Sequence, residues 1–363
     1  MAGPTLPEQF KAAVFPAMDA PLEIIQVDFR QPGPGQLVLK VHACSLSNND
    51  AIFASGLLED AKWPRTPGAY VCGEVVAIAP AHGHSRTGSG EGKLGSLFGK
   101  LSLKFKHEEK EREVKVGDKV IAIVQHNRGG LAEYCTLTSD AFLCPILDKF
   151  DPLDQLVAAT SGGRAVKAYR RFVDEDKKRT EQETEAARRR DEERGMKGEG
   201  VVVVYGAGGY ARMCLTAITA FAPAKLSNQR VVLVTPSDRW PAKEYRIGEE
   251  DMLVVGRDDV REKLREMGGV KLVLAADQPH AGFTELLHSM RYQSEIVLLT
   301  LKGHEDLKLN TGELLAHSIA VSGGPHLLGT DMHRTLTFLA ELDLRAHLKI
   351  HTSDFTREGV NDA

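Results

Sequence analysis

Apolar and polar residues alternate in short runs through residues 1–150, which is the pattern of β-strands. Glycine and proline separate the runs, as they do at turns between strands. The pattern predicts a β-rich region that forms a barrel or a partly open sheet. The expected strands cover residues 11–15, 22–27, 36–42, 73–79, 118–124 and 132–137.

Beyond residue 156 the pattern changes to fully apolar runs that alternate with helix-forming segments. An unbroken apolar run is typical of a strand that is covered on both faces, as in a parallel sheet. The alternation therefore predicts an α/β region with a doubly wound parallel sheet. Its expected strands cover residues 201–205, 230–235, 251–255, 271–275 and 295–300, and residues 319–324 are a candidate edge strand.

The strand Val201–Tyr205 runs directly into a glycine-rich turn, Gly206-Ala-Gly-Gly-Tyr-Ala211. Glycines let the backbone turn tightly and approach a pyrophosphate closely. The helix that follows offers free N–H groups and the positive end of its dipole to that phosphate. The turn therefore predicts a dinucleotide site, and the alternative is a turn that only joins strand to helix. The expected binding residues are Gly206, Gly208, Gly209, Tyr210 and Ala211.

The end of the next strand bears on which dinucleotide binds. NAD-selective sites place an acidic residue there to hold the ribose 2′-hydroxyl, but this strand ends at Thr235. Ser237, Arg239 and Lys243 follow it and can meet a 2′-phosphate, so the sequence favours NADP(H) over NAD(H). The alternative is an ordinary polar turn, which the neighbouring Asp238 supports.

Two segments interrupt the pattern of strands and helices. Residues 82–113 are rich in glycine and then in charge, so we expect an exposed loop without a core. Residues 174–194 carry mixed charges with i,i+4 pairs such as Glu185 with Arg189. A helix that is polar on all faces has nothing to bury, so we interpret this segment as a solvated helical extension; a partner-binding helix is the alternative.

Composition sets limits on size, partners and location. A chain of 363 residues exceeds the size at which single cores stop growing, about 250–300 residues, so two lobes are expected. The net charge of −4 argues against nucleic-acid and membrane partners and leaves a small-molecule substrate. Five cysteines without a C-x-x-C pair, together with no secretory leader pattern, predict a cytoplasmic protein with reduced thiols.

Several motifs occur together and in one order along the chain: residues 32–44, the Val-Gly-Asp-Lys-Val turn at 116–120, and Gly-Gly-Leu-Ala-Glu-Tyr at 129–134. With the glycine turn, they resemble the medium-chain dehydrogenase/reductase superfamily. The resemblance implies a GroES-like catalytic domain at 1–155 and a Rossmann cofactor domain at 156–330. Residues 331–363 would return to the catalytic domain and stop short of the family's last strand, as if truncated.

The resemblance also bears on metal binding. Zinc-dependent members use a cysteine and a G-H-E histidine to polarise the substrate oxygen. This chain has Ser47 at the cysteine position and Gly68-Ala69-Tyr70 in place of G-H-E. Residues 82–115 also lack the four cysteines of the family's structural zinc lobe. We therefore expect no metal, and a relation to the zinc-independent quinone oxidoreductases and enoyl reductases.

Reactions of that branch suggest a function. Conjugation spreads the charge that develops when hydride adds to an enone, so a few preorganised donors can replace the metal. Tyr70, Asn48 and Ser47 are the expected catalytic residues, although each is equally suited to packing. The alternative is a non-catalytic dinucleotide-binding scaffold or interaction protein. A homodimer formed through residues 319–324 is a further expectation, with a capped edge as its alternative.

Overall fold

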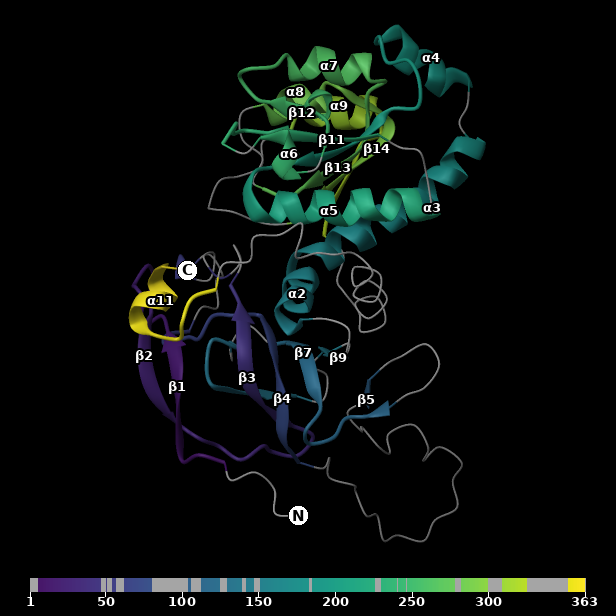
Figure 1. Cartoon of the computed structure of the whole chain (residues 1–363). Helices are drawn as coiled ribbons and strands as arrows, with labels where there is room; N and C mark the ends of the chain where they lie inside the picture. Colours follow the sequence, from purple (N-terminus) through teal and green to yellow (C-terminus); the bar gives the residue numbers. More distant parts are fainter. Residues whose placement is uncertain are drawn as a thin grey trace, which may run out of the picture. The chain divides into compact units, whose positions relative to one another are not determined.

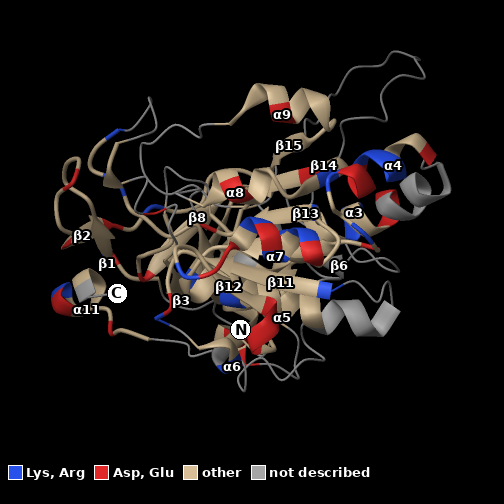
Figure 2. Cartoon of the chain, turned by 90° about the horizontal axis from the view of Figure 1, so that it is seen from above, with Lys and Arg blue, Asp and Glu red and all other residues tan. Residues whose placement is uncertain are grey.

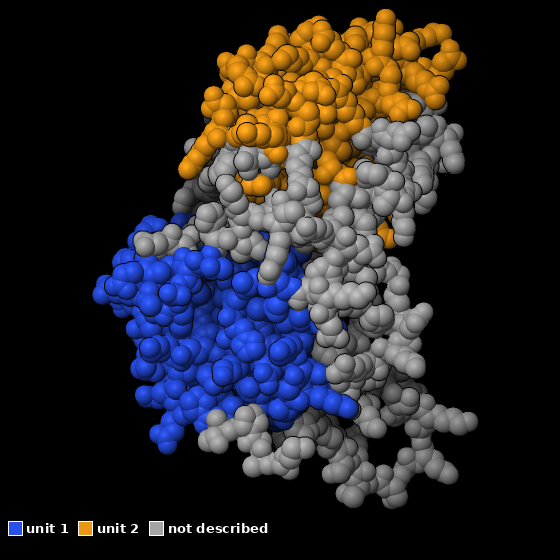
Figure 3. Space-filling view, viewed as in Figure 1, with its two compact units in different colours: residues 1–160, 328–340, 350–363 blue, residues 161–327, 341–349 orange. Residues whose placement is uncertain are grey.

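The computed structural model divides into two compact units. Unit 1 comprises residues 1–160, 328–340 and 350–363, and unit 2 comprises residues 161–327 and 341–349 (Figure 3). The structure describes residues 6–46, 50, 54–56, 62–79, 104–105, 112–124, 129–138, 142–146, 151–182, 185–225, 230–239, 241–245, 247–277, 282–299, 309–324 and 352–362.

Unit 1 is built on an antiparallel five-stranded sheet in the order β8-β3-β4-β7-β9. A second antiparallel pair joins β1 (Gln9–Val14) to β2 (Glu23–Asp28). Inward-facing aliphatic residues, Leu37, Leu39 and Val71 among them, form the core of the larger sheet. The sheet's strands are β3 (Leu37–Ser45), β4 (Tyr70–Ile78), β7 (Lys119–Ile123), β8 (Tyr134–Leu137) and β9 (Phe142–Pro145).

The final described segment folds back onto unit 1. Helix α11 (Arg357–Asp362) lies beside β1 and β2 (Figure 1). The Asn361 side chain forms two hydrogen bonds with the backbone of Leu22: its Oδ1 accepts from the N–H at 2.9 Å, and its Nδ2 donates to the carbonyl at 3.1 Å. Val360 is buried with Ala13 in the same cluster. These contacts join residues more than three hundred positions apart in sequence.

Unit 2 contains a six-stranded parallel sheet in the order β12-β11-β10-β13-β14-β15. The chain starts at the centre and builds outward in both directions, as in doubly wound nucleotide-binding folds. This confirms the expected α/β fold with a β-rich first part. The strands are β10 (Val201–Tyr205), β11 (Arg230–Thr235), β12 (Met252–Val254), β13 (Val270–Ala275), β14 (Met290–Leu298) and β15 (Ala320–Gly323).

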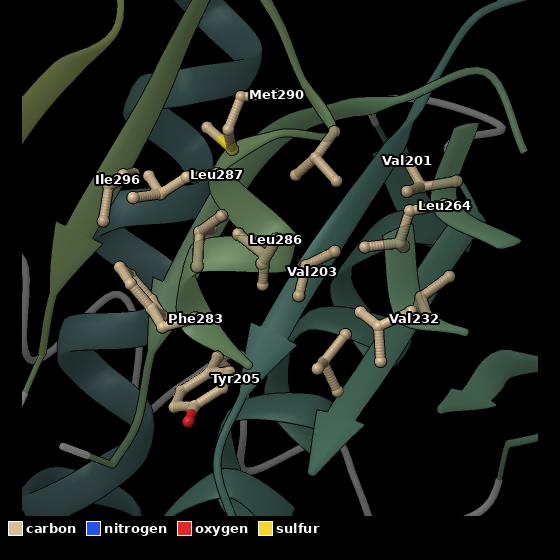
Figure 4. Packing of buried hydrophobic residues seen from close by; sticks show 14 of the residues in the cluster. Val201, Val203, Tyr205, Val232, Leu264, Phe283, Leu286, Leu287, Met290 and Ile296 are labelled. Carbon is tan, nitrogen blue, oxygen red and sulfur yellow. The ribbon is translucent and has the colours of Figure 1, made fainter. Parts of the chain in front are cut away.

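Helices pack on both faces of this sheet. On one face, Phe283, Leu286 and Leu264 pack against Val203 and Val232 of the central strands (Figure 4). On the other face, α5 contacts β10 and β11, and α3 contacts β13 (Figure 1). The helices of unit 2 are α3 (Gly163–Gln182), α4 (Glu185–Glu193), α5 (Gly208–Lys225), α6 (Ala242–Tyr245), α7 (Val260–Glu266), α8 (Phe283–Leu287) and α9 (Thr311–Ala316).

Within the charged segment, residues 174–182 and 185–193 are helical, as expected, and Arg189 pairs with Glu185 at 3.3 Å. Helix α4 carries charges of both signs (Figure 2). The expectation that the segment buries nothing is wrong for α4, because Ala187 and Asp191 are buried against β14. Asp191 accepts a hydrogen bond from the Tyr292 N–H at 3.0 Å and pairs with Arg291 Nε at 3.1 Å. The charge pattern alone did not reveal these partners.

Most of the predicted loop at 82–113 lies outside the described residues. Its described parts form a short antiparallel pair, β5 (Lys104–Phe105) with β6 (Arg112–Glu113). The candidate edge strand at 319–324 is confirmed as β15, and the strand expected at 295–300 begins earlier, at Met290. Among the described helices, none is both long enough and apolar enough to cross a membrane.

The Asp191–Arg291 pair predicts that α4 contributes to stability. Asp191→Ala should lower the free energy of unfolding by about 3 kcal/mol, because it leaves a buried guanidinium without its carboxylate. Glu185→Ala on the same helix removes only an exposed pair and should cost less than about 1 kcal/mol. Urea unfolding measures both values. Equal losses in the two variants would show that the buried pair contributes no more than the exposed one.

Candidate functional site

The turn from β10 into α5 has the backbone geometry that the glycine pattern predicts. Gly206 adopts φ +142°, and Gly208 adopts φ +79°, both in the region that favours glycine. A Cβ on Gly206 would stand 2.9 Å from the Cβ of Asp277, so the turn passes close to the end of β13. A Cβ on Gly208 or Gly209 would meet nothing within 4 Å. The turn therefore packs closely against Asp277 at Gly206 and leaves open space beside Gly208 and Gly209.

The first turn of α5 is fixed to the sheet by its other two predicted residues. Ala211 is fully buried, and the Tyr210 hydroxyl donates to the Leu299 carbonyl at 3.4 Å, just beyond the end of β14. The first N–H groups of a helix have no partner within the helix. They carry the positive end of its dipole, which favours a bound anion. The open glycines at this terminus fit the cradle that a diphosphate requires.

Residues expected to select the cofactor gather at the end of β11. The Thr235 hydroxyl donates to the Ser237 carbonyl at 2.9 Å and accepts from its N–H at 3.2 Å, so it shapes the turn. Ser237 Oγ accepts from the Arg239 N–H at 3.2 Å. Arg239, Asp238 and Lys243 are exposed. The turn therefore presents two cations and one carboxylate to solvent.

Sequence reasoning missed one polar group beside the glycine turn. Tyr245, the last residue of α6, is 2% exposed, and no described residue accepts a hydrogen bond from its hydroxyl. Burial raises the pKa of this phenol, and the neighbouring Gly208 N–H and Arg212 act in the opposite direction. Because the ring is apolar, the sequence pattern marks Tyr245 as a core residue. Nothing in that pattern shows where the hydroxyl points.

Of the expected catalytic residues, the structure describes only Tyr70, because Ser47 and Asn48 lie outside the described residues. Tyr70 begins β4, is 5% exposed, and pairs with Ser45 on one side and Ile123 on the other. Ala69 precedes it and is also buried. The strand therefore holds the Tyr70 backbone firmly in the sheet of unit 1.

A small pocket within unit 1 borders this strand end, with room for about one water molecule. Asp50 and Arg65 line it, and both are buried. Asp50 Oδ1 accepts a hydrogen bond from the Gly68 N–H at 2.6 Å, and the Arg65 guanidinium lies 5.7 Å from the centre of the Trp63 ring. Sequence reasoning did not select these two opposite charges, because side chains that line one pocket only in the fold leave no spacing signal.

Ala69 and other described side chains bear on whether unit 1 could hold zinc. The alanine methyl offers no ligand atom, and the Asp50 carboxylate is hydrogen-bonded to the backbone. Burial raises the pKa of the Cys135 and Cys144 thiols to about 12, so these cysteines stay protonated at neutral pH. Within the described ranges, no group of three or more His, Cys, Asp or Glu side chains could hold a metal ion.

Comparisons with known proteins agree with this architecture. Residues 33–148 match the family model for the alcohol dehydrogenase GroES-like domain. The chain is 23% identical over 328 residues to alcohol dehydrogenase patD of Aspergillus clavatus, covering 86% of this chain and 72% of the relative. A solved quinone oxidoreductase of Pseudomonas syringae superposes with a TM-score of 0.67 at 17% identity, covering 97% and 94% of the two chains. Residues 33–148 thus match the GroES-like domain of alcohol dehydrogenases, and the chain is similar over most of its length to members of the medium-chain dehydrogenase/reductase superfamily.

The similarity to alcohol dehydrogenases over most of the chain supports an oxidoreductase. A further solved member superposes with a TM-score of 0.65 at 17% identity, covering 98% and 95% of the two chains. It is described as a short chain alcohol dehydrogenase (rspB) of Escherichia coli CFT073, complexed with NADH. The resemblance found in the sequence motifs is thus confirmed at the level of the superfamily.

Proposed function

We propose that this dehydrogenase/reductase is a zinc-independent, NADP(H)-dependent reductase of an activated C=C bond or a quinone. The observation that carries the proposal is the glycine turn, open at Gly208 and Gly209, in a chain whose Ala69 replaces the metal-ligating histidine of zinc-dependent members. The first feature supports a dinucleotide, and the second supports chemistry without a Lewis acid. The likeness to a quinone oxidoreductase is consistent with both.

The preference for NADP(H) rests on charge at the end of β11. Arg239 and Lys243 are exposed and can meet a 2′-phosphate, and Ser237 can add a hydrogen bond. Asp238 is the one carboxylate between Ser237 and Lys243, and it could instead hold a 2′-hydroxyl. The NADH found with the Escherichia coli structure shows that the superfamily also uses the other cofactor.

The chain's own groups would stabilise charge at the substrate. When bound, the nicotinamide cofactor supplies the hydride that adds to the β-carbon of a conjugated carbonyl. Tyr70, Asn48 and Ser47 are proposed to donate hydrogen bonds to the oxygen on which negative charge develops. The buried Arg65 adds positive charge near the start of β4, where low dielectric strengthens its effect. No metal is needed if these donors are preorganised.

A non-catalytic scaffold is the second candidate function. The replacement of the histidine by Ala69 favours it, because a cofactor domain can persist after catalysis is lost. The exposed charges of α4, such as Glu185 and Arg189, would then provide contact surface. The two candidates differ in turnover rather than in nucleotide binding.

The end of β11 gives a direct test of cofactor selection. Arg239→Ala should weaken NADPH binding about tenfold and leave NADH binding unchanged, because only NADPH carries the 2′-phosphate that the guanidinium would bind. Arg230→Ala, at the other end of the same strand, is the matched control and should change neither affinity. Calorimetric titration measures both cofactors. Equal losses for the two nucleotides in Arg239→Ala would contradict selection by this residue.

Turnover separates the two candidate functions. We expect NADPH oxidation with enones or quinones, at a rate that a zinc chelator does not change, because no step needs a metal. The measurement is the loss of NADPH absorbance with a panel of enones, quinones and simple aldehydes, with and without chelator. Activity that a chelator abolishes and zinc restores would contradict the proposal. Binding of NADPH without turnover of any substrate would favour the scaffold.

We also propose a homodimer that forms through β15. This strand is at the edge of the sheet, its Val321 is 37% exposed, and Leu315 of the preceding helix is 82% exposed. Two such edges could pair and cover these side chains. Light scattering should give twice the chain mass for the wild type and a monomer for Val321→Lys. A monomeric wild type at micromolar concentration would exclude the dimer under those conditions.

A further inference from the structure

The Tyr245 hydroxyl calls for a physical explanation. Its side chain is 2% exposed at the end of α6, which packs against α5. The Gly208 N–H approaches the hydroxyl oxygen, and no described residue accepts a hydrogen bond from the O–H. Leaving a buried hydroxyl without a partner costs about 1–3 kcal/mol. Such groups in native proteins usually have a partner that is absent from the structure, or a functional role.

The surroundings of the hydroxyl suggest what that partner is. The Gly208 N–H and the Arg212 side chain both lie near the phenol oxygen. Burial raises the pKa of Tyr245, so the phenol keeps its proton at neutral pH and can donate. An amide N–H, a guanidinium and a phenol are all donors. The partner that the phenol O–H lacks must be an acceptor, and the positive charge of the nearby Arg212 favours an anion.

The position in the fold narrows the choice of anion. Gly208 is the first residue of α5, an 18-residue helix whose N-terminus attracts negative charge. On the side where a Cβ would stand, Gly208 meets no atom within 4 Å. A phosphate oxygen can therefore approach the backbone at this point. Arg239, in the turn after β11, and Lys243, in α6, are proposed to bind the 2′-phosphate, and neither belongs to the start of α5.

We propose that Tyr245 is a cofactor-binding residue that donates its O–H to an oxygen of the diphosphate at the N-terminus of α5. This inference rests on the proposed function, because it requires that the chain bind a nicotinamide dinucleotide. The Gly208 N–H and the Arg212 guanidinium act on the same anionic group. The buried O–H of Tyr245 therefore lowers the stability of the free protein. The bound diphosphate removes this cost by accepting the hydrogen bond.

The test is Tyr245→Phe in the full-length protein, with binding and stability measured separately. NADPH, NADH and ADP all carry the diphosphate, and each should bind about tenfold more weakly to the variant. Binding of 2′-AMP, which has a 2′-phosphate and no diphosphate, should not change. The Tm without nucleotide should stay the same or rise, because the change removes an unpaired buried hydroxyl.

Tyr134→Phe is the matched control. It also removes one phenol hydroxyl, in unit 1, while its ring can keep its edge contacts with Phe10 and Phe29. It should change none of the nucleotide affinities.

Three outcomes would overturn the inference while the wild type binds NADPH normally. Unchanged affinities in Tyr245→Phe would show that the hydroxyl does not contact the cofactor. Losses confined to NADPH and 2′-AMP would place it at the 2′-phosphate. A lower Tm without nucleotide would show that the hydroxyl has a partner within the fold. If the wild type binds no nucleotide, the proposed function fails, and the inference fails with it.

Discussion

The close approach of the β10–α5 turn to the end of β13 is the constraint on which the candidate site depends. At Gly206, a side chain would collide with Asp277, and the backbone takes a conformation that other residues avoid. Because glycine satisfies both conditions, the chain can leave the central strand and enter α5 without displacing its neighbour. The N-terminus of α5 is thereby placed just beyond the carboxyl end of the central strand β10, with Gly208 and Gly209 open. The proposals about diphosphate binding follow from that placement.

Electrostatics has different roles in the two units. In unit 2, the pair Asp191–Arg291 is buried and attaches the charged α4 to the sheet, where it serves structure. In unit 1, Asp50 and Arg65 are buried beside a small pocket at the start of β4. Desolvation makes both arrangements costly to disrupt. Burial of charge is therefore not by itself a sign of function. The charges in unit 1 differ from those in unit 2 because they adjoin a pocket.

Local sequence patterns predicted those parts of the fold that depend on local chemistry. Apolar runs gave the strands of the parallel sheet, and the glycine pattern gave the turn before α5, because strand burial and backbone conformation depend on residue type nearby. Two features could not be predicted. The burial of Asp191 depends on Arg291 and Tyr292, about a hundred residues away. The position of the Tyr245 hydroxyl depends on how α6 packs against α5, which composition does not encode. Ser47 and Asn48 stay predictions, since they lie outside the described residues.

The central claim is that the open glycine turn binds NADPH. Calorimetric titration of the purified wild-type chain with NADPH, and separately with NADH, tests it most directly. If the glycine turn binds the cofactor, we expect saturable binding of NADPH at micromolar affinity and much weaker binding of NADH. If neither nucleotide binds, the turn only joins β10 to α5, and the proposed reductase function is contradicted.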